Sequence, residues 1–471
     1  MILNFSFNRN WSSFWHRPEP LPLRRPNLHQ LAQQPTALPA EVKRCPVAMK
    51  YLKLLGPLAW GDFPERDPQR PWPGHTPRLR APFAAAYLVK LNQNLRYMTQ
   101  LRTFLIEHPA LVWLLGFELV PADHLPYGFD PEASVPATRH FLSVLRSLDN
   151  DALQLLLDQT IDLIRHQLPQ TCSFGQVISL DTKHIIAWVK ENNPKVFIKE
   201  GRYDKLNQPK ADRDCKLGVK KRRNTPTKEG QPLSGKPVTE LYWGYASGIV
   251  VTIIPDYGEV VLAELTQTFE KSDLTYFFPL MELTQRRLGF PPPYGTLDAA
   301  FDAFYVYEYF HNAGGFAAVP LSQRGGHRSF DEQGWPLCSA GLPMPPKHTF
   351  QRHAGLVPHQ QARHACPLLF PNPNGQSCPI NHKRWPKGGC LTTLATSIGA
   401  RIRHQLDRQH PNFKRIYQQR SATERINALA KDLGIERPKL RNQLAITNLN
   451  TLIYVLLNLR AFHRIRDRQA D

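Results

Sequence analysis

The stretch 174–312 alternates between strand-like and helix-like patterns, and this alternation limits the fold more than any other feature of the chain. Three short apolar runs of strand type come first, with hairpin turn residues between the second and third, at 176–181, 248–254 and 259–265. A short strand that ends near Asp298 then lies between two segments with helical spacing, 274–288 and 304–312. Strands and helices in this order predict an α/β core.

The rest of the chain divides around this core. Residues 1–82 are rich in Pro and predict a mostly irregular N-terminal arm. Residues 83–170 carry apolar residues every three or four positions and predict a helical domain. Residues 322–395 show little periodicity, so we expect an insertion that divides the core into 171–321 and 396–471.

The chain is strongly basic, with a formal net charge of +20 over 471 residues and a pI near 9.7. A field of this sign attracts polyanions, either nucleic acid or an acidic membrane. The most apolar run, 452–457, is far shorter than the roughly 20 residues that span a bilayer, and the N-terminus resembles no secretory signal. We therefore expect a cytoplasmic, DNA-associated protein with no membrane partner.

A helix predicted over 413–434 carries four polar side chains on one side. Tyr417, Glu424 and Lys431 follow one another at intervals of seven, and Arg420 falls between the first two. The opposite side is apolar and can pack against a sheet. Taken alone, such a stripe is a solvated face with an ion pair between Arg420 and Glu424.

The spacing Tyr-x2-Arg-x3-Glu-x6-Lys resembles the signature of a large group of bacterial insertion-sequence transposases of the DDE type. Members of that group also have one Asp at the end of a first core strand and a second on a later strand. Asp181 in SLDTKHI and Asp298 in TLDAAFDAF match these positions, and HPALVWLLGF resembles the group's N-terminal domain, which here would make 83–170 the DNA-binding domain. The resemblance extends over about 83–462.

This resemblance implies a ribonuclease H-like core in which Asp181, Asp298 and Glu424 meet as catalytic residues and as ligands of two Mg²⁺ ions. Two such ions act on the attacking and the leaving oxygen of a phosphodiester displacement, and carboxylates suit them. The implied activity is endonucleolytic cleavage at terminal inverted repeats and strand transfer into target DNA by a homodimer. Arg420 and Lys431 would then hold phosphates, and Tyr417 would contact the backbone or a displaced base.

Several alternatives stay open at this point. Asp302 replaces Asp298 as the ligand if the strand ends later, and Asp181 can simply end a strand. For Asp212 and Asp214, which lie in a basic excursion, local ion pairing is the expected use. The whole chain can also be a DNA-binding protein that has lost catalysis, or a metal-dependent nuclease without strand transfer.

Three further groups of residues are candidates for binding. A basic cluster can contact phosphates or form a solvated loop, and consists of Lys220, Lys221, Arg222 and Arg223. The insertion contains four of the seven Cys, which can hold a structural Zn²⁺ or stay reduced thiols, since no tight Cys-x-x-Cys pair is present: Cys338, Cys366, Cys378 and Cys390. His364 and His382 are further candidate ligands. Three Trp can stack on a flipped base or belong to the core, namely Trp243, Trp335 and Trp385.

Overall fold

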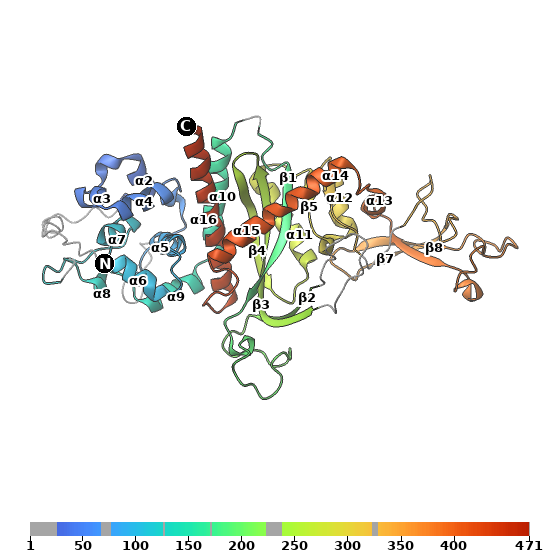
Figure 1. Ribbon diagram of the computed structural model, residues 1–471, viewed down its shortest axis with the longest axis horizontal. Helices are drawn as coiled ribbons and strands as arrows, with labels where there is room; N and C mark the ends of the chain where they lie inside the picture. The colour runs from blue at the N-terminus through green and yellow to red at the C-terminus, as the bar shows by residue number, and fades with distance from the viewer. Residues whose placement is uncertain are drawn as a thin grey trace.

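The computed structural model describes residues 26–66, 77–125, 128–169, 172–222, 238–322 and 328–470. These residues form an elongated molecule in which a group of N-terminal helices, a central sheet and a projecting smaller sheet follow one another (Figure 1). The chain is therefore of the α/β class, as predicted.

The N-terminal part is helical from its first described residues. Its helices are α2 (Leu28–Gln33), α3 (Ala40–Arg44), α4 (Pro46–Leu55), α5 (Ala81–Asn92), α6 (Met98–Ile106), α7 (Pro109–Leu115), α8 (Pro131–Ser134), α9 (Thr138–Ser147) and α10 (Asn150–Gln167), with short 3-10 turns η1 (Pro35–Ala37) and η2 (Trp60–Asp62). The segment 83–170 is helical as predicted. The capping carboxylate of Asp149, which accepts from the backbone of Asp151, separates α9 from α10.

The prediction of an irregular N-terminal arm is wrong for the part that the structure describes. Residues 26–66 form α2, α3 and α4, and their apolar side chains join the same core as α5 and α7. Pro is compatible with these helices because Pro35 and Pro46 begin a helix, where a missing N–H breaks no hydrogen bond. Residues 1–25 and 67–76 of the predicted arm lie outside the described residues.

A six-stranded mixed sheet forms the centre of the molecule. Its strands are β1 (Val177–Ile186), β2 (Lys216–Arg222), β3 (Val238–Ile254), β4 (Gly258–Thr268), β5 (Tyr294–Thr296) and β6 (Phe316–Ala318). The long strand β3 pairs antiparallel with β1, β2 and β4, whereas β1, β5 and β6 run parallel to one another. The predicted hairpin is confirmed as β3 and β4, with Asp256 and Gly258 in the left-handed region that such a turn requires.

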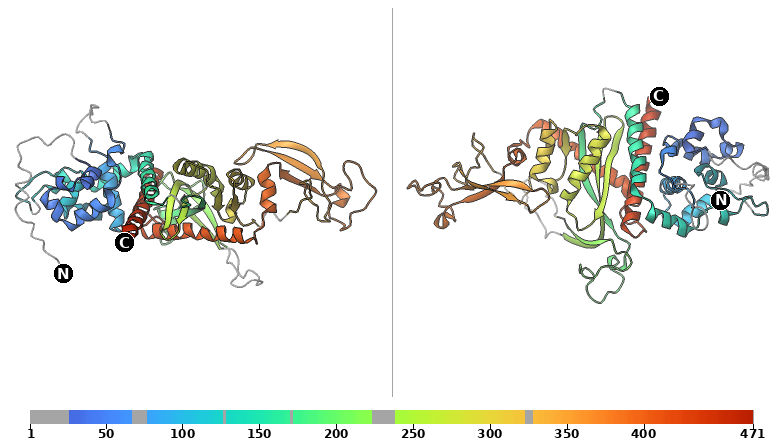
Figure 2. Two further views of the ribbon diagram at one scale, coloured as in Figure 1. Left: turned by 90° about the horizontal axis from the view of Figure 1, so that it is seen from above. Right: turned by 180° about the vertical axis from the view of Figure 1, so that it is seen from behind.

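Helices cover both faces of this sheet (Figure 2). The helices and turns that follow β4 are η4 (Asp273–Tyr276), α11 (Phe277–Leu288), η5 (Ala299–Phe301), α12 (Phe304–Asn312), α13 (Ile398–Gln405), α14 (Pro411–Tyr417), η7 (Gln418–Arg420), α15 (Ser421–Asp432) and α16 (Gln443–Ala470). Ile249 packs in the cluster that contains Ile426 of α15, whereas its neighbour Val250 packs with Leu280 of α11. Successive residues of a strand thus face opposite layers.

The long helix α16 joins the N-terminal helices to the sheet. It lies beside α10 between these two parts of the molecule (Figure 1). By length and composition the segment Gln443–Gln469 could cross a membrane, but 78% of its most apolar window is buried inside the protein. One apolar cluster, to which α16 contributes, contains residues of the N-terminal helices and of the sheet, so the two parts share a core.

The carboxyl group of Glu264 is buried among polar side chains between β4, α10 and α16. It accepts hydrogen bonds from Gln154 Nε2 at 2.9 Å and from the hydroxyl of Thr451. Burial raises the pKa of Glu264 to about 7, although these hydrogen bonds and the positive charge of Arg287 act in the opposite direction. The folded protein therefore favours the protonated form of this group.

We expect the free energy of unfolding to decrease as the pH rises from 4.5, the ordinary pKa of Glu264, to about 7, its value in the folded protein. A pKa that is higher in the folded state contributes stability below the unfolded value, and this contribution is lost above the folded value. The loss should be roughly 3 kcal/mol at most. Glu264→Gln should remove this component, as measured by urea unfolding across the pH range. The exposed Glu270→Gln serves as control, and equal pH profiles for wild type and Glu264→Gln would contradict the expectation.

The stretch 328–395 forms a separate sheet that projects from the core (Figure 1). Its antiparallel strands are β7 (Pro346–Arg352), β8 (His359–Ala365) and β9 (Leu391–Ala395), in that order. Further 3-10 turns are η3 (Lys190–Asn192), after β1, and η6 (Trp385–Lys387), before β9. All residues of β7 are exposed, so this sheet presents an open face to solvent.

Candidate active site

Two of the predicted acids lie near each other, Asp181 on β1 and Asp298 just after the neighbouring strand β5. In the parallel pairing of β1 with β5, Ser179 is level with Thr296. Asp181 lies two residues further along β1 and Asp298 lies two residues beyond the end of β5, and they are close enough that the negative charge of Asp298 raises the pKa of Asp181. Asp298 is the N-cap of η5, and its Oδ1 accepts a hydrogen bond from the backbone of that turn at 2.9 Å.

Burial and neighbouring acids outweigh the nearby positive charge of Arg420 at this pair. Burial raises the pKa of Asp181 to about 6, and the negative charges of Asp298 and Asp273 raise it as well. The pKa of Asp298 is raised for the same reasons, first by burial and then by Asp273. Backbone N–H groups and Arg420 lower both pKa values without reversing either shift. A further cation at this place would therefore be favoured.

Asp273 is a third acid at this place, and sequence reasoning missed it. It is the first residue of η4, which packs against η5, and its Oδ1 accepts a hydrogen bond from Thr182 Oγ1 at 2.7 Å. Asp273 follows Ser272 at the start of a helical turn, and acids are common at such positions because they can accept hydrogen bonds from free backbone N–H groups. The sequence therefore contains no signal that separates this acid from other acids at helix starts.

The third predicted acid, Glu424, is linked to the pair through Arg420. Arg420 Nη2 donates to Glu424 Oε1 at 2.6 Å, and the Glu424 side chain is 54% exposed. Arg420 influences the pKa values of Asp181 and Asp298, whereas Glu424 is not among the charges that act on them. In this conformation no group of three or more His, Cys, Asp or Glu residues within the described ranges is placed to hold a metal ion.

The predicted stripe does not lie on a single continuous α-helix. The helix α14 ends at Tyr417, whose carbonyl oxygen accepts from Thr296 Oγ1 at 3.3 Å, and the 3-10 turn η7 separates it from α15. Lys431 Nζ lies 3.4 Å from a carboxylate oxygen of Glu436, which also binds Lys183 of β1. Lys431 and Lys183 thus share one acid beside the strand that carries Asp181.

Asp302, the alternative to Asp298, is fully engaged elsewhere. Its carboxylate accepts from Arg403 at 2.7 and 2.5 Å, from Tyr307 Oη at 2.8 Å and from the backbone of Ser322 at 2.7 Å. Burial acts to raise its pKa, but these hydrogen bonds hold the pKa of Asp302 below its ordinary value. The carboxylate of Asp302 is therefore occupied by contacts that stabilise the fold. This geometry favours Asp298 over Asp302 as the candidate ligand of a cation.

Two other acids of the basic excursion have local partners as well. Asp212 is buried and accepts a hydrogen bond from Tyr245 Oη at 2.8 Å. Asp214 accepts from the backbone N–H of Gln443 at 2.9 Å, at the start of α16. These bonds are to neutral donors, so the predicted local use is right in kind although it is not ion pairing.

The basic cluster is described only in part. Lys220, Lys221 and Arg222 belong to β2, and Lys220 lies opposite Glu240 of β3. Arg223 lies outside the described residues, as do the side chains of Lys221 and Arg222. The role of this cluster in DNA binding stays a prediction.

The four Cys of the insertion do not gather as one set. Burial raises the pKa of Cys390 to about 12, and the thiols of Cys366 and Cys338 raise it further, so these three lie near one another. Cys378 lies apart from that group, and its Sγ accepts from the backbone of His382 at 3.5 Å. A structural Zn²⁺ stays a prediction, because neither these thiols nor the other described His, Cys, Asp and Glu side chains form a group of three placed to hold a metal ion.

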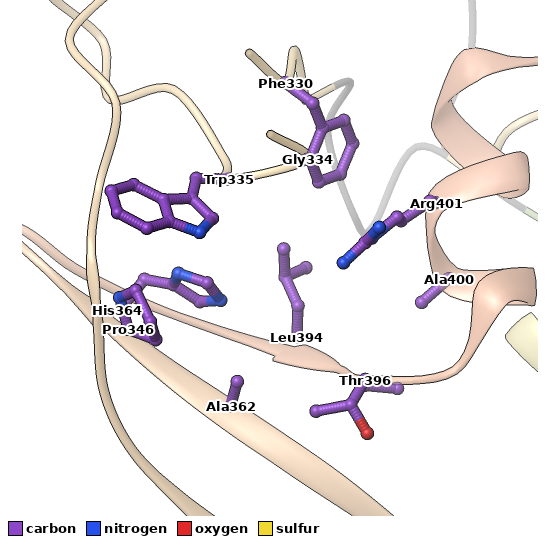
Figure 3. A pocket seen from close by; sticks show the side chains of 11 residues that line it. Phe330, Gly334, Trp335, Pro346, Ala362, His364, Leu394, Thr396, Ala400 and Arg401 are labelled. Atoms are coloured by element: carbon purple, nitrogen blue, oxygen red, sulfur yellow. The ribbon is translucent and has the colours of Figure 1, made fainter. Parts of the chain in front are cut away.

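A pocket lies where the insertion joins α13 (Figure 3). Trp335, His364 and Arg401 are among the residues that line it, so an aromatic ring and a guanidinium group face the same hollow. Trp243, in contrast, is completely buried in the core, and this excludes it as a stacking partner for a base. Trp385 begins η6 and is partly exposed.

Comparison of the chain with protein-family models gives no match, and comparison with curated protein sequences gives none either. The function must therefore be inferred from the chemistry of this site.

Proposed function

We propose that this chain is a DDE transposase, a phosphoryl-transfer enzyme that binds the ends of an insertion sequence, cleaves them and joins them to target DNA. The observation that carries the proposal is the proximity of Asp181 on β1 to Asp298, which lies just after the neighbouring parallel strand β5, so that the charge of Asp298 acts on Asp181. Arg420 of η7 adds a cation beside this pair. The mixed sheet with acids on neighbouring strands supports a ribonuclease H-like core.

The residues of the pair fit divalent cations. Carboxylate oxygens are the ligands that Mg²⁺ prefers, and the pKa values of Asp181 and Asp298 are raised first by burial and then by the negative charge of neighbouring acids. When bound, two Mg²⁺ ions would stabilise the attacking and leaving oxygens of the phosphodiester. Asp181 and Asp298 would hold them, with Glu424 as the third ligand.

Glu424 can complete this set by turning away from Arg420. An exposed ion pair of this kind contributes about 1 kcal/mol or less, so its exchange costs little. Arg420 would then be free to bind a phosphate of the DNA through its planar, bidentate donor group. The Arg420 and Glu424 pair therefore represents a resting arrangement of the proposed site.

A plasmid assay of the full chain tests the proposal. A supercoiled plasmid carrying the gene with its flanking DNA is incubated with the protein, Mg²⁺ and a second target plasmid. We expect breaks at both flanks and joined products, and none after addition of a chelator. Cleavage without joined products would indicate a nuclease, and binding without cleavage a DNA-binding protein. Protein that neither binds nor cleaves this DNA would overturn the proposal.

Arg420→Ala should reduce the slope of log affinity against log salt concentration by about one unit, because one phosphate contact is lost. Lys431→Ala should do the same if it leaves Glu436 for DNA. The loss of cleavage rate should exceed the loss of affinity, since negative charge grows on the phosphoryl oxygens in the transition state. Binding is measured by fluorescence anisotropy over a salt series.

Arg425→Ala is the matched control, because Arg425 lies on the same helix but binds Glu259. Its salt slope and cleavage rate should stay near wild type. An unchanged slope for Arg420→Ala would show that Arg420 belongs to a solvated surface.

The remaining parts of the proposal concern assembly and location. Two element ends must be held together for transposition, so we propose a homodimer on paired terminal inverted repeats. The net charge of +20 suits a protein that binds DNA in the cytoplasm.

A further inference from the structure

The amide of Asn427 is the closest side-chain partner of Asp181 that the structure shows. Asn427 lies on α15 about one turn after Glu424, and its Nδ2 donates to Asp181 Oδ2 at 3.3 Å. The residue is only 8% exposed, and its Oδ1 is buried without a hydrogen-bond partner among the described residues. The Nδ2 end of this buried amide thus donates to the proposed active-site acid, whereas its Oδ1 end has no hydrogen-bond partner among the described residues.

An open amide oxygen at this depth needs an explanation. A buried acceptor without a donor costs about 1 to 3 kcal/mol, and most such groups in proteins are bonded. Asn458 of α16 shows the ordinary arrangement, because its amide both accepts from and donates to the backbone of Val261, at 2.9 and 2.8 Å. Asn427 therefore differs from Asn458 in its open oxygen, and its Nδ2 binds an acid of the proposed site.

Rotation of the amide does not remove the difficulty. Exchanging the two ends would place Oδ1 of Asn427 against Oδ2 of Asp181, and an ionised carboxylate has no proton to donate. The observed orientation is therefore the one that suits an ionised Asp181.

We infer that Asn427 is a positioning residue of the proposed active site, which orients the Asp181 carboxylate through Nδ2 and offers Oδ1 as a neutral oxygen to the divalent cation. This inference rests on the proposed function. Partners of metal ligands fix the orientation of those ligands, and their loss commonly lowers metal affinity by about 10 to 100-fold. Asn427 thus adds a fourth functional position to α15 and its preceding turn, beside Arg420, Glu424 and Lys431.

The test compares Asn427→Leu with wild type in the full-length protein, using Mn²⁺ as a spectroscopic probe of the cation site. We expect the Mn²⁺ affinity, measured by electron paramagnetic resonance, to fall by roughly 10 to 100-fold. Cleavage of end DNA should fall at low Mn²⁺ and recover in part at high Mn²⁺, while DNA affinity stays near wild type. A purely structural role would lower thermal stability without this dependence on metal concentration.

Asn450→Leu is the matched control. Asn450 of α16 is also buried with an open Oδ1, but its Nδ2 donates to Thr266 Oγ1 at 2.8 Å, away from the acid pair. This variant should change stability alone. If Asn427→Leu does not fold, Asn427→Ser provides the same test, because a Ser side chain is too short to replace the amide at Asp181.

The outcomes separate this inference from the proposed function. Mn²⁺ binding that is lost in Asp181→Ala but unchanged in both Asn427 variants would overturn the role of Asn427 and leave the proposed function intact. Wild-type protein that binds no Mn²⁺, with Asp181→Ala behaving like wild type, would overturn both. Reduced Mn²⁺ affinity in Asn427→Leu, with wild-type affinity in Asn450→Leu, supports the inference.

Discussion

Replacing Asp181 or Asp298 by Ala should abolish Mg²⁺-dependent cleavage and strand transfer, with a fall in cleavage rate of about a thousandfold or more. Each substitution removes cation ligands from the acid pair, so charge on the transferring phosphoryl group is no longer stabilised. DNA affinity should stay close to wild type, because neither acid contacts phosphate directly. Cleavage of labelled end DNA and a binding assay on the same DNA measure the two effects separately.

The control for these variants is Asp162→Ala, which replaces an exposed acid of α10 and should cleave like wild type. Glu424→Ala should also abolish cleavage if Glu424 turns from Arg420 toward the cations. Cleavage that survives in Glu424→Ala would show that its role is limited to pairing with Arg420. Cleavage that survives in Asp298→Ala would contradict the assignment of the second ligand.

Replacing Asp302 by Ala should lower the free energy of unfolding by about 3 to 5 kcal/mol, because the guanidinium group of Arg403 is left without its charge partner. The Asp302 side chain is only 1% exposed, so water cannot replace the lost carboxylate. The hydroxyl of Tyr307 and the backbone N–H of Ser322 also lose their acceptor. Urea unfolding followed by circular dichroism measures the change.

A double variant separates the ion pair from the other hydrogen bonds. Asp302→Ala combined with Arg403→Leu should recover part of the lost stability, since it removes the uncompensated charge. Any cleavage activity of Asp302→Ala below its unfolding temperature should persist. Loss of cleavage without loss of stability would instead place the second cation ligand at Asp302, four residues beyond Asp298.

Much of the core could be predicted because the sequence patterns of its strands and helices depend on residues close together in the chain. The apolar runs that became β1, β3 and β4 alternate with helical spacing at α11 and α12, and each pattern reflects neighbours within one turn or along one strand. Asp181 and Asp298 were predicted as a pair from a resemblance to a known family, and the parallel pairing of β1 with β5 brings them near each other. Composition predicted an irregular arm, but it does not report which Pro residues begin helices, so 26–66 was missed.

What the sequence alone determined was the order of strands and helices and the position of Asp298 just after a strand. Asp181 was predicted to end its strand, but it lies in the middle of β1, which continues to Ile186 because it pairs with the long strand β3. The tertiary structure decided which distant side chains meet these acids. Asp273 reaches the pair because η4 packs against η5, and Asn427 reaches Asp181 because the apolar side of α15 packs on the sheet. Asp302 is excluded by Arg403, a residue from beyond the insertion. Periodicity and spacing describe a residue's own element, whereas contacts between elements depend on how complete helices and strands pack together.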